Sequence, residues 1–235
     1  MVRWCRHHPW SWTMRPNRHE RTAPPMSGSS ELSPRYEFGT RMPGPQRRRQ
    51  LLSVAREHFA AYGFHTTTME DIAESARVSK PVLYQHFSGK HELYCAVLES
   101  AIELFENQVI TPLLRDIGNK TRTKAMIANF IDVVINDHDV YRILFESDAR
   151  ANESVARKLD GLVARVSQRL GRTLSENSDL DDEDCDFLAQ ALVGLAISAA
   201  RIVSTTECPD KQLRQQFLLF KLVWRGLENV DKPWE

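Results

Sequence analysis

Hydrophobic residues from Gln46 onward recur every three or four positions, the spacing that gathers side chains on one face of an α-helix. No segment in this stretch alternates apolar and polar residues as a half-buried strand would. The sequence therefore predicts an all-α protein. Its longer helices are expected over residues 90–108, 122–137, 139–147, 152–174, 182–205 and 210–229.

Three shorter helices are expected ahead of the long ones. The first covers about 46–62 and ends at Gly63, because glycine commonly follows the last turn of a helix. One stripe of apolar residues should face inward along it: Leu51, Leu52, Ala55, Phe59 and Tyr62.

The second short helix should run from Met69 to about Arg77, with Thr67 as its N-cap and Glu70 completing a capping box. After a tight turn, Ser79 should cap the third helix, and Ser88 should cap the long fourth one. Two helices joined by such a turn form a helix-turn-helix, whose second member fits the major groove of DNA. The expected inward residues of the short pair are Ile72, Ala73, Ala76, Leu83 and Phe87.

The letters of this segment are more specific than its helical pattern. They include T-T-x-x-D-I-A from Thr67, V-S-K from Val78, L-Y-x-H-F from Leu83 and K-x-E-L-Y from Lys90. With these motifs, residues 46–94 resemble the tetracycline-repressor-like (TetR/AcrR) family of bacterial transcriptional regulators. The family usually has glycine where this sequence has Arg77. An arginine adopts the left-handed region only at a cost of about 1–2 kcal/mol, so we expect a turn that is slightly strained or differently shaped, and the alternative is that Arg77 adds a phosphate contact.

The resemblance assigns base contacts to the start of the third helix. Ser79 would offer its hydroxyl or N–H to a phosphate, while Lys80, Pro81 and Val82 would meet base edges. Val82 and Pro81 lack hydrogen-bonding side chains, so Lys80 is the polar reader, with guanine the expected partner.

Phosphate contacts are expected from five further residues: Arg47, Thr68, Tyr84, His86 and Lys90. Lys90 stands at the start of the fourth helix, where free N–H groups favour an anion. Alternatives stay open for three of them: Tyr84 could be partly core, His86 could pack on its own helix, and Arg47 could belong to a solvated charge cluster.

The last two helices carry more apolar surface than one core needs. Residues 187–203 are apolar almost all round, which predicts burial on more than one side. In this family the two C-terminal helices build a four-helix bundle between two subunits, and the alternative is that both fill a monomer core. The expected interface residues are Ala191, Leu195, Ala199, Phe217, Phe220 and Trp224.

By the same resemblance, the middle helices would enclose a small-molecule effector. The candidate residues are Asn129, Phe130, Tyr141, Phe145 and Arg201. The sequence has no nucleophile–base pair, phosphate-binding glycine loop or metal-ligand cluster, and its four cysteines lack zinc-site spacing. We therefore expect no enzymatic activity, no metal and no cofactor.

Charge and composition divide the chain further. The formal net charge of zero conceals 14 Lys+Arg against 8 Asp+Glu in residues 1–94. Residues 1–45 hold seven of the eleven prolines and are expected to be disordered or a mis-assigned extension, with Met26 and Met42 as alternative starts. The expected division is thus 1–45, then DNA binding by 46–94, then effector binding and dimerisation by 95–235.

No uninterrupted apolar run is long enough for a membrane span, because Gln190 and Arg201 interrupt the longest one. We therefore expect a cytoplasmic, homodimeric regulator, with repression of a palindromic operator as the predicted role. The alternative is a helical protein-interaction module that has lost DNA binding.

Overall fold

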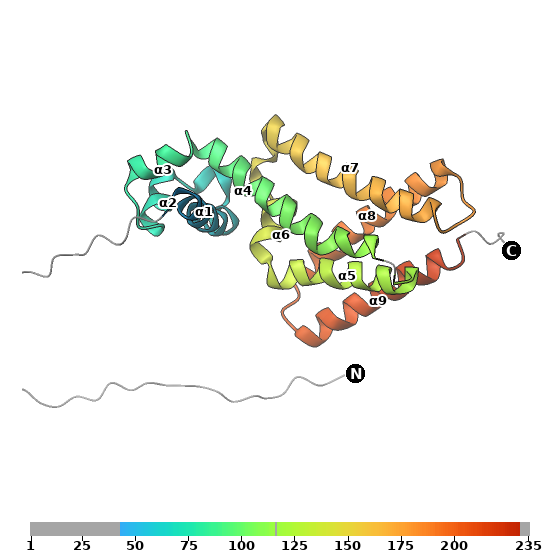
Figure 1. Ribbon diagram of the computed structural model, residues 1–235. Helices are drawn as coiled ribbons and strands as arrows, with labels where there is room; N and C mark the ends of the chain where they lie inside the picture. The colour runs from blue at the N-terminus through green and yellow to red at the C-terminus, as the bar shows by residue number, and fades with distance from the viewer. Residues whose placement is uncertain (1–42, 116, 231–235) are drawn as a thin grey trace, which may run out of the picture. The chain divides into compact units, whose positions relative to one another are not determined.

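The computed structural model describes residues 43–115 and 117–230, which contain helices and no strand. The all-α prediction is confirmed, whereas the expectations for residues 1–42 lie outside the described part. Figure 1 labels the α-helices, whose bounds are α1 Gly44–Thr66, α2 Met69–Ser75, α3 Lys80–His86, α4 Lys90–Phe105, α5 Asn119–Asn136, α6 His138–Phe145, α7 Glu153–Ser175, α8 Asp182–Ser204 and α9 Pro209–Leu227.

Helices α1, α2 and α3 pack around a common core. Leu51, Ala55 and Phe59 are buried on α1, and the residues expected to face inward on α2 and α3 are buried as well. Tyr62 is the exception: its side chain is 63% exposed, so its assignment to the stripe was wrong. Tyr62 is the last residue before Gly63, which has a φ of 80° and kinks the end of the helix.

The kink also moves the cap of α2 by one residue. Thr67 was expected as the N-cap, but its hydroxyl donates to the carbonyl of Gly63 over 2.8 Å and the residue is buried. Thr68 is the N-cap, and it forms a capping box with Asp71 rather than Glu70. Both pairs have the required three-residue separation, so the contact of Thr67 with the kinked helix end decides between them.

Arg77 occupies the turn between α2 and α3 with a φ of 54°, and it is the one non-glycine residue of the described part with a positive φ. Of the two shapes left open for this turn, the structure has the one with a left-handed arginine. Its N–H donates to Glu74, and the next N–H, of Val78, reaches back to Ala73 over 3.0 Å. These bonds close the turn that a glycine would form without steric cost.

The remaining helices form the body of the protein. Helix α4 continues into a π-turn, Glu106–Ile110, and a 3-10 turn, Thr111–Leu114. Helix α7 packs along α8, and α5 packs against α6, α8 and α9 (Figure 1). A short 3-10 turn, Asp148–Ala151, joins α6 to α7 and also contacts α1.

Helix α8 is less buried within the chain than its composition predicts. It is the one helix of the described residues long and apolar enough to cross a membrane by length and composition. Only 22% of its apolar 18-residue stretch is buried inside the protein. Phe187 and Ile202 are 68% and 59% exposed. Length and apolar composition alone are weak evidence that a helix spans a membrane.

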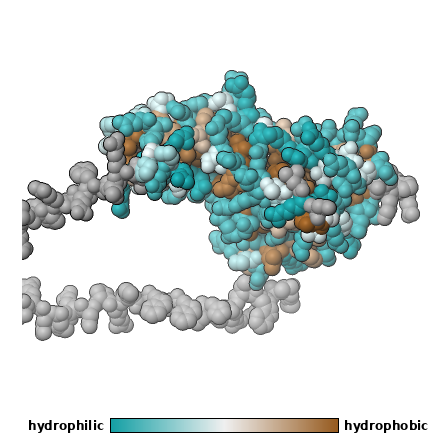
Figure 2. Space-filling model, in the orientation of Figure 1, coloured by the Kyte–Doolittle hydropathy of each residue, from teal (hydrophilic) through white to brown (hydrophobic). Residues whose placement is uncertain are grey.

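The face of the molecule shown in Figure 2 is mostly hydrophilic, with hydrophobic residues showing in several separate places.

Candidate DNA interface and effector cavity

The start of α3 presents the residues expected to meet base edges. Ser79 is the N-cap, but its hydroxyl makes no capping hydrogen bond and so stays free for another acceptor. Lys80 and Pro81 are exposed and Val82 is half-buried, while Leu83 anchors the helix in the core. The helix therefore offers a polar and an apolar side chain together at its exposed end, as base reading requires.

Lys80 forms an ion pair with Glu70 of α2. This contact lowers the pKa of the Glu70 carboxyl and raises the pKa of the Lys80 amine. Both side chains are more than half exposed, so the pair is weakly stabilising and can open when a stronger partner arrives. A base edge or phosphate would have to compete with Glu70 for this lysine.

The second half of α3 carries the expected phosphate contacts. Tyr84 is 44% exposed, which removes the alternative that it is buried in the core. His86 is half-buried beside it. Gln85 is also exposed on this helix, and its amide has the donor and acceptor that bind adenine. Gln85 is the x of the L-Y-x-H-F motif. Because the motif specifies no residue at that place, the sequence did not single it out as a DNA contact.

Three other expected phosphate contacts already have partners within the chain. The Thr68 hydroxyl donates to Asp71 over 2.7 Å, and Arg47 Nη1 donates to Gln50 over 2.6 Å. Lys90 Nζ donates to the carbonyls of His65 and Thr67, at 3.2 and 3.0 Å. Phosphate contacts by these side chains therefore stay predictions, since each would have to give up or share a bond.

An apolar surface runs along α8 and α9. On α8 it consists of exposed residues spaced three or four apart, all without a polar side chain except Ser198: Phe187, Ala191, Gly194, Ser198 and Ile202. On α9 the exposed large apolar residues are Leu213, Phe217, Leu218 and Leu222. We call these nine residues the α8–α9 face. The small residues at the middle of α8 would allow another helix to approach closely.

Four residues expected in the dimer interface turn toward their own chain. Leu195, Ala199 and Phe220 are half-buried against the core, and Trp224 lines a cavity. Only Ala191 and Phe217 of the six lie on the α8–α9 face. An interface role for the other four stays a prediction, because α9 is apolar on two faces and a spacing of three and four does not say which face meets the core.

A cavity of about 300 Å³ lies within the body, walled by residues of α4 to α9. Its lining is predominantly apolar and includes Phe105, Phe130 and Phe145, whose rings meet edge to face with centroids 5.7–6.1 Å apart. This size and lining are typical of small-molecule sites.

A few polar groups also line the cavity. Two nitrogens of Arg122 have hydrogen-bond partners: Nη1 donates to the carbonyl of Leu113 over 3.3 Å, and Nη2 donates to the side-chain oxygen of Asn119. Its Nε, however, is buried without a hydrogen-bond partner among the described residues, and so is the indole Nε1 of Trp224. Both residues line the cavity, and each has one N–H donor that lacks a partner within the described part of the chain.

The sequence identified two of the cavity residues, Phe130 and Phe145. The other three candidates lie elsewhere: Asn129 Nδ2 donates to the carbonyl of Gln108 over 2.7 Å, Tyr141 is buried outside the lining, and Arg201 is exposed near the end of α8. Each was chosen as a polar side chain among apolar neighbours in sequence. The cavity instead combines distant elements, so Arg122 and Trp224 carried no local signal.

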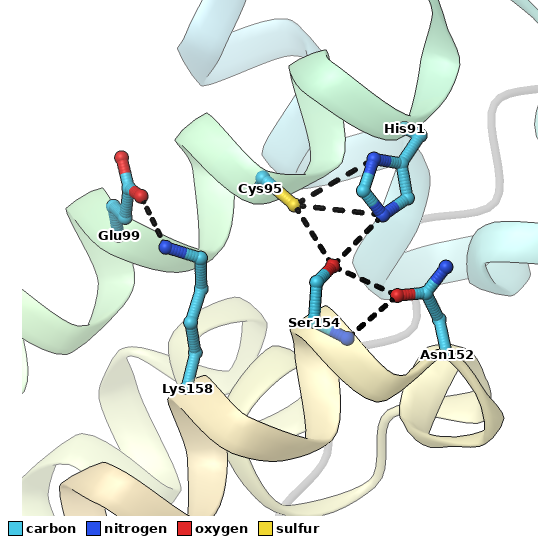
Figure 3. Close-up of polar contacts among 6 residues, drawn as sticks. All are labelled: His91, Cys95, Glu99, Asn152, Ser154 and Lys158. Atoms are coloured by element: carbon cyan, nitrogen blue, oxygen red, sulfur yellow. Dashed lines mark hydrogen bonds and ion pairs between the residues drawn. The ribbon is translucent and has the colours of Figure 1, made fainter.

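Polar contacts tie α4, which follows the DNA-binding helices, to α7 (Figure 3). His91 contacts the hydroxyl of Ser154 at 3.0 Å from Nε2, and Lys158 donates to Glu99 over 2.5 Å. Farther along α4 the π-turn is held as well, because Arg165 donates to Glu106 over 2.7 Å. The DNA-binding end and the body are therefore connected along a shared helix.

A helix-turn-helix with an exposed recognition helix, joined to a helical body that encloses a cavity, defines the class of DNA-binding transcriptional regulators. Comparison with known proteins agrees with this class. Residues 51–97 match the family model for bacterial regulatory proteins of the tetR family. The HTH-type transcriptional activator FasR of Mycolicibacterium smegmatis is 34% identical over 193 residues, which cover 82% of this chain and 88% of that protein.

Solved structures show the same fold. A TetR-like transcriptional regulator from Rhodococcus sp. RHA1 superposes with a TM-score of 0.68 at 25% identity, over 80% of this chain and 99% of that one. AibR in complex with isovaleryl coenzyme A and operator DNA gives a TM-score of 0.60 at 22% identity, over 75% and 97%.

The chain belongs to the tetR family of bacterial regulatory proteins. It is accordingly a DNA-binding transcriptional regulator rather than an enzyme, and it works as a dimer that responds to a small-molecule effector.

Proposed function

We propose that this regulator represses transcription from a palindromic operator in the cytoplasm, and that an amphipathic small molecule with a long apolar part releases it. Residues 46–94 bind DNA in this proposal, and residues 95–235 hold the effector and the dimer contact. The observation that carries it is the apolar cavity, whose lining residues Arg122 and Trp224 each have an unpartnered N–H donor, in a chain whose recognition helix α3 is exposed.

The DNA contact centres on Lys80. Its amine lies at the exposed start of α3 and is held only by an exposed ion pair with Glu70. Ser79, with a free hydroxyl, and Tyr84, with an exposed ring, lie on either side of it along the chain. We assign base contact to Lys80 and Val82, and phosphate contact to Ser79 and Tyr84.

The effector is inferred from the cavity lining. A mostly apolar wall favours a hydrocarbon portion, because burying it there removes apolar surface from water. Arg122 Nε and Trp224 Nε1 would bind an oxygen acceptor, and the charge of the guanidinium favours a carboxylate. A fatty acid, or another acyl compound with such an acceptor, matches both requirements. In AibR, a relative in fold, the crystallised ligand is isovaleryl coenzyme A.

The dimer contact is assigned to the α8–α9 face. Its large apolar residues, among them Leu213 and Phe217, are exposed in the single chain, and association of two copies would bury them. Two recognition helices would then engage successive major grooves, roughly 34–36 Å apart.

Substitutions in α3 test the DNA contact. Lys80→Ala should weaken operator binding about tenfold, because a good base contact contributes on the order of 1–3 kcal/mol. Tyr84→Phe should weaken it less, about threefold, by removing one phosphate hydrogen bond. Lys124→Ala, which removes an exposed charge from α5, is the matched control. Full affinity of both α3 variants, measured by fluorescence anisotropy at fixed salt, would contradict the assignment.

Saturated fatty acids of increasing length test the effector class. Palmitate should bind the dimer, and binding should weaken as the chain shortens because less apolar surface is buried. Arg122→Gln should weaken palmitate binding about tenfold while leaving the affinity for 1-hexadecanol nearly unchanged, since the alcohol lacks the carboxylate. Equal losses for both compounds would show that Arg122 acts only on the shape of the cavity.

A reporter placed behind the operator tests repression. Deletion of the regulator should raise expression from the promoter. A fall in expression would instead show that the protein activates transcription, as the name of the relative FasR says of that protein. For the alternative, a protein-interaction module without DNA binding, random duplexes should yield no enriched sequence after repeated selection.

A further inference from the structure

The short segment from Phe145 to Asp148 connects the effector cavity with the DNA-binding helices. Phe145 is the last residue of α6 and forms part of the cavity wall. Its ring meets Phe105 and Phe130 inside the wall and stacks on Tyr141, with centroids 5.6 Å apart. A molecule that occupies the part of the cavity beside Phe145 touches this ring, and three residues later the chain reaches α1.

Asp148 binds the end of α1 with both carboxylate oxygens. Oδ1 accepts the backbone N–H of Phe64 over 2.7 Å, and Oδ2 accepts that of His65 over 3.1 Å. Burial raises the pKa of Asp148, but the two N–H donors and the nearby His65 outweigh this effect, so the pKa lies below its ordinary value. The contact therefore holds an ionised carboxylate at neutral pH.

The backbone of α1 is shaped to receive this carboxylate. Gly63 has a φ of 80°, which L side chains rarely adopt, and the kink frees the following N–H groups from the helical ladder. A Cβ at Gly63 would lie 2.6 Å from Asp148 Oδ2, closer than atoms can approach. The glycine thus serves two purposes, because it permits the kink and leaves room for the carboxylate.

The residue before Asp148 binds the neighbouring helix. Ser147 Oγ is 2.6 Å from the hydroxyl of Tyr94 on α4, whose ring is buried. That ring packs edge to face on Phe59 and Phe64 of α1, with centroids 5.0 and 5.1 Å apart. Consecutive residues behind the cavity wall therefore hold both α1 and α4, the two helices that support the helix-turn-helix.

We propose that Asp148 is a positioning residue that fixes the DNA-binding helices against the body and makes their position depend on Phe145 in the cavity wall. Displacement of the Phe145 ring shifts the 145–148 segment, which moves or breaks the contact at the end of α1. The recognition helices of the dimer then change their spacing. The dependence on an occupant rests on the proposed function, whereas the fixing of α1 does not.

Asp148→Asn tests the fixing directly, because asparagine keeps the shape but replaces one acceptor oxygen with an N–H donor. Hydrogen exchange at the amides of Phe64 and His65 should accelerate about tenfold, as expected for losing a hydrogen bond to a charged group. Asp132→Asn, an equal change on the exposed side of α5, should leave those amides unchanged. Unchanged exchange in Asp148→Asn would overturn the proposal.

Operator affinity with and without palmitate tests the coupling. In the wild-type dimer, saturating palmitate should weaken operator binding about tenfold or more, within the usual range of allosteric coupling. In Asp148→Asn it should bind equally well but change operator affinity less than about twofold. Ser147→Ala, which removes the Tyr94 contact and the hydrogen bond that Ser147 Oγ accepts from the N–H of Ala149 but keeps the Asp148 carboxylate, should fall between the two and serves if the first variant unfolds.

The outcomes separate the two proposals. If palmitate fails to bind the wild-type protein, the effector class is wrong, and exchange at Phe64 and His65 still decides whether Asp148 fixes α1. If palmitate binds and releases DNA equally from the wild-type protein and from Asp148→Asn, the coupling through Asp148 is overturned.

Discussion

The DNA-binding helices and the body of this protein place their functional residues in different ways. Within residues 46–94, the exposed residues of α3 follow one another along a single short helix that Leu83 anchors in the core. In the body, the cavity is walled by residues of α4 to α9, and its two residues with unpartnered N–H donors, Arg122 and Trp224, belong to different helices, α5 and α9. A fixed partner, duplex DNA, constrains a sequence locally, whereas a cavity assembled from distant helices does not.

The largest effect is expected from a substitution on the α8–α9 face, which tests where the body forms the dimer contact. Phe217→Glu places a charge on the α8–α9 face, where burial in an interface would be costly. Sedimentation should show a monomer, and operator affinity should fall about a hundredfold or more because one recognition helix reads too few bases.

Lys211→Glu, an exposed change at the start of the same helix, is the control and should leave the dimer intact. A dimer that survives Phe217→Glu would place the interface elsewhere in the body.

The cavity gives the next largest effect. Ala196→Phe adds a ring to the cavity wall on α8 and should weaken palmitate binding at least about tenfold by occupying its space. Operator affinity without palmitate should stay within about twofold when the new ring leaves Phe145 in place, because the coupling proposed above runs through that residue. Isothermal titration and anisotropy measure the two quantities. A parallel loss of DNA binding that disappears when Asp148→Asn is added would mean that the new ring displaces Phe145 as an effector does, and a loss that persists would mean that the substitution distorts the body as a whole.

The turn of the helix-turn-helix offers a stabilising change. Arg77→Gly should raise the free energy of unfolding by about 1 kcal/mol, because glycine adopts the positive φ without steric cost. The gain is reduced by the greater freedom of glycine in the unfolded chain. Urea denaturation measures it. An unchanged stability with weaker operator binding would show instead that Arg77 contacts a phosphate.

The smallest effect concerns pH. Since the pKa of Asp148 is lower in the folded protein than in the unfolded chain, its contact stabilises the fold above the ordinary carboxyl pKa of about 4. That stabilisation is lost as the pH falls through the lower, folded value. The stability difference between the wild type and Asp148→Asn should therefore be larger at pH 7 than near pH 3. An equal difference at both values would show that the carboxylate charge is not involved.

Local spacing explains what the sequence could predict. A capping threonine, a proline in the first turn and the apolar positions of α2 and α3 all act within a few residues, so their consequences follow from order along the chain. The misplacement of the α2 cap at Thr67 has the same origin, since Thr67 and Thr68 both have an acidic residue three positions on. Only the contact of Thr67 with Gly63 distinguishes them.

Long-range contacts explain what the sequence could not predict. Asp148 lies 84 residues from Phe64, and nothing near either residue in the sequence indicates their hydrogen bond. Helix α9 shows the second difficulty, because Phe217 and Phe220 belong to one apolar pattern yet face opposite environments. Whether a face meets the core, a cavity or another subunit depends on helices far away in sequence.

Selection of bound sequences from random duplexes tests the central claim most directly, since DNA reading by α3 is what the sequence predicts in most detail. The wild-type dimer should enrich a palindrome whose half-sites lie about one helical turn apart. Lys80→Ala should relax the preference at one position in each half-site and leave the spacing unchanged. No enriched sequence from the wild type, or an identical preference from Lys80→Ala, would contradict the account.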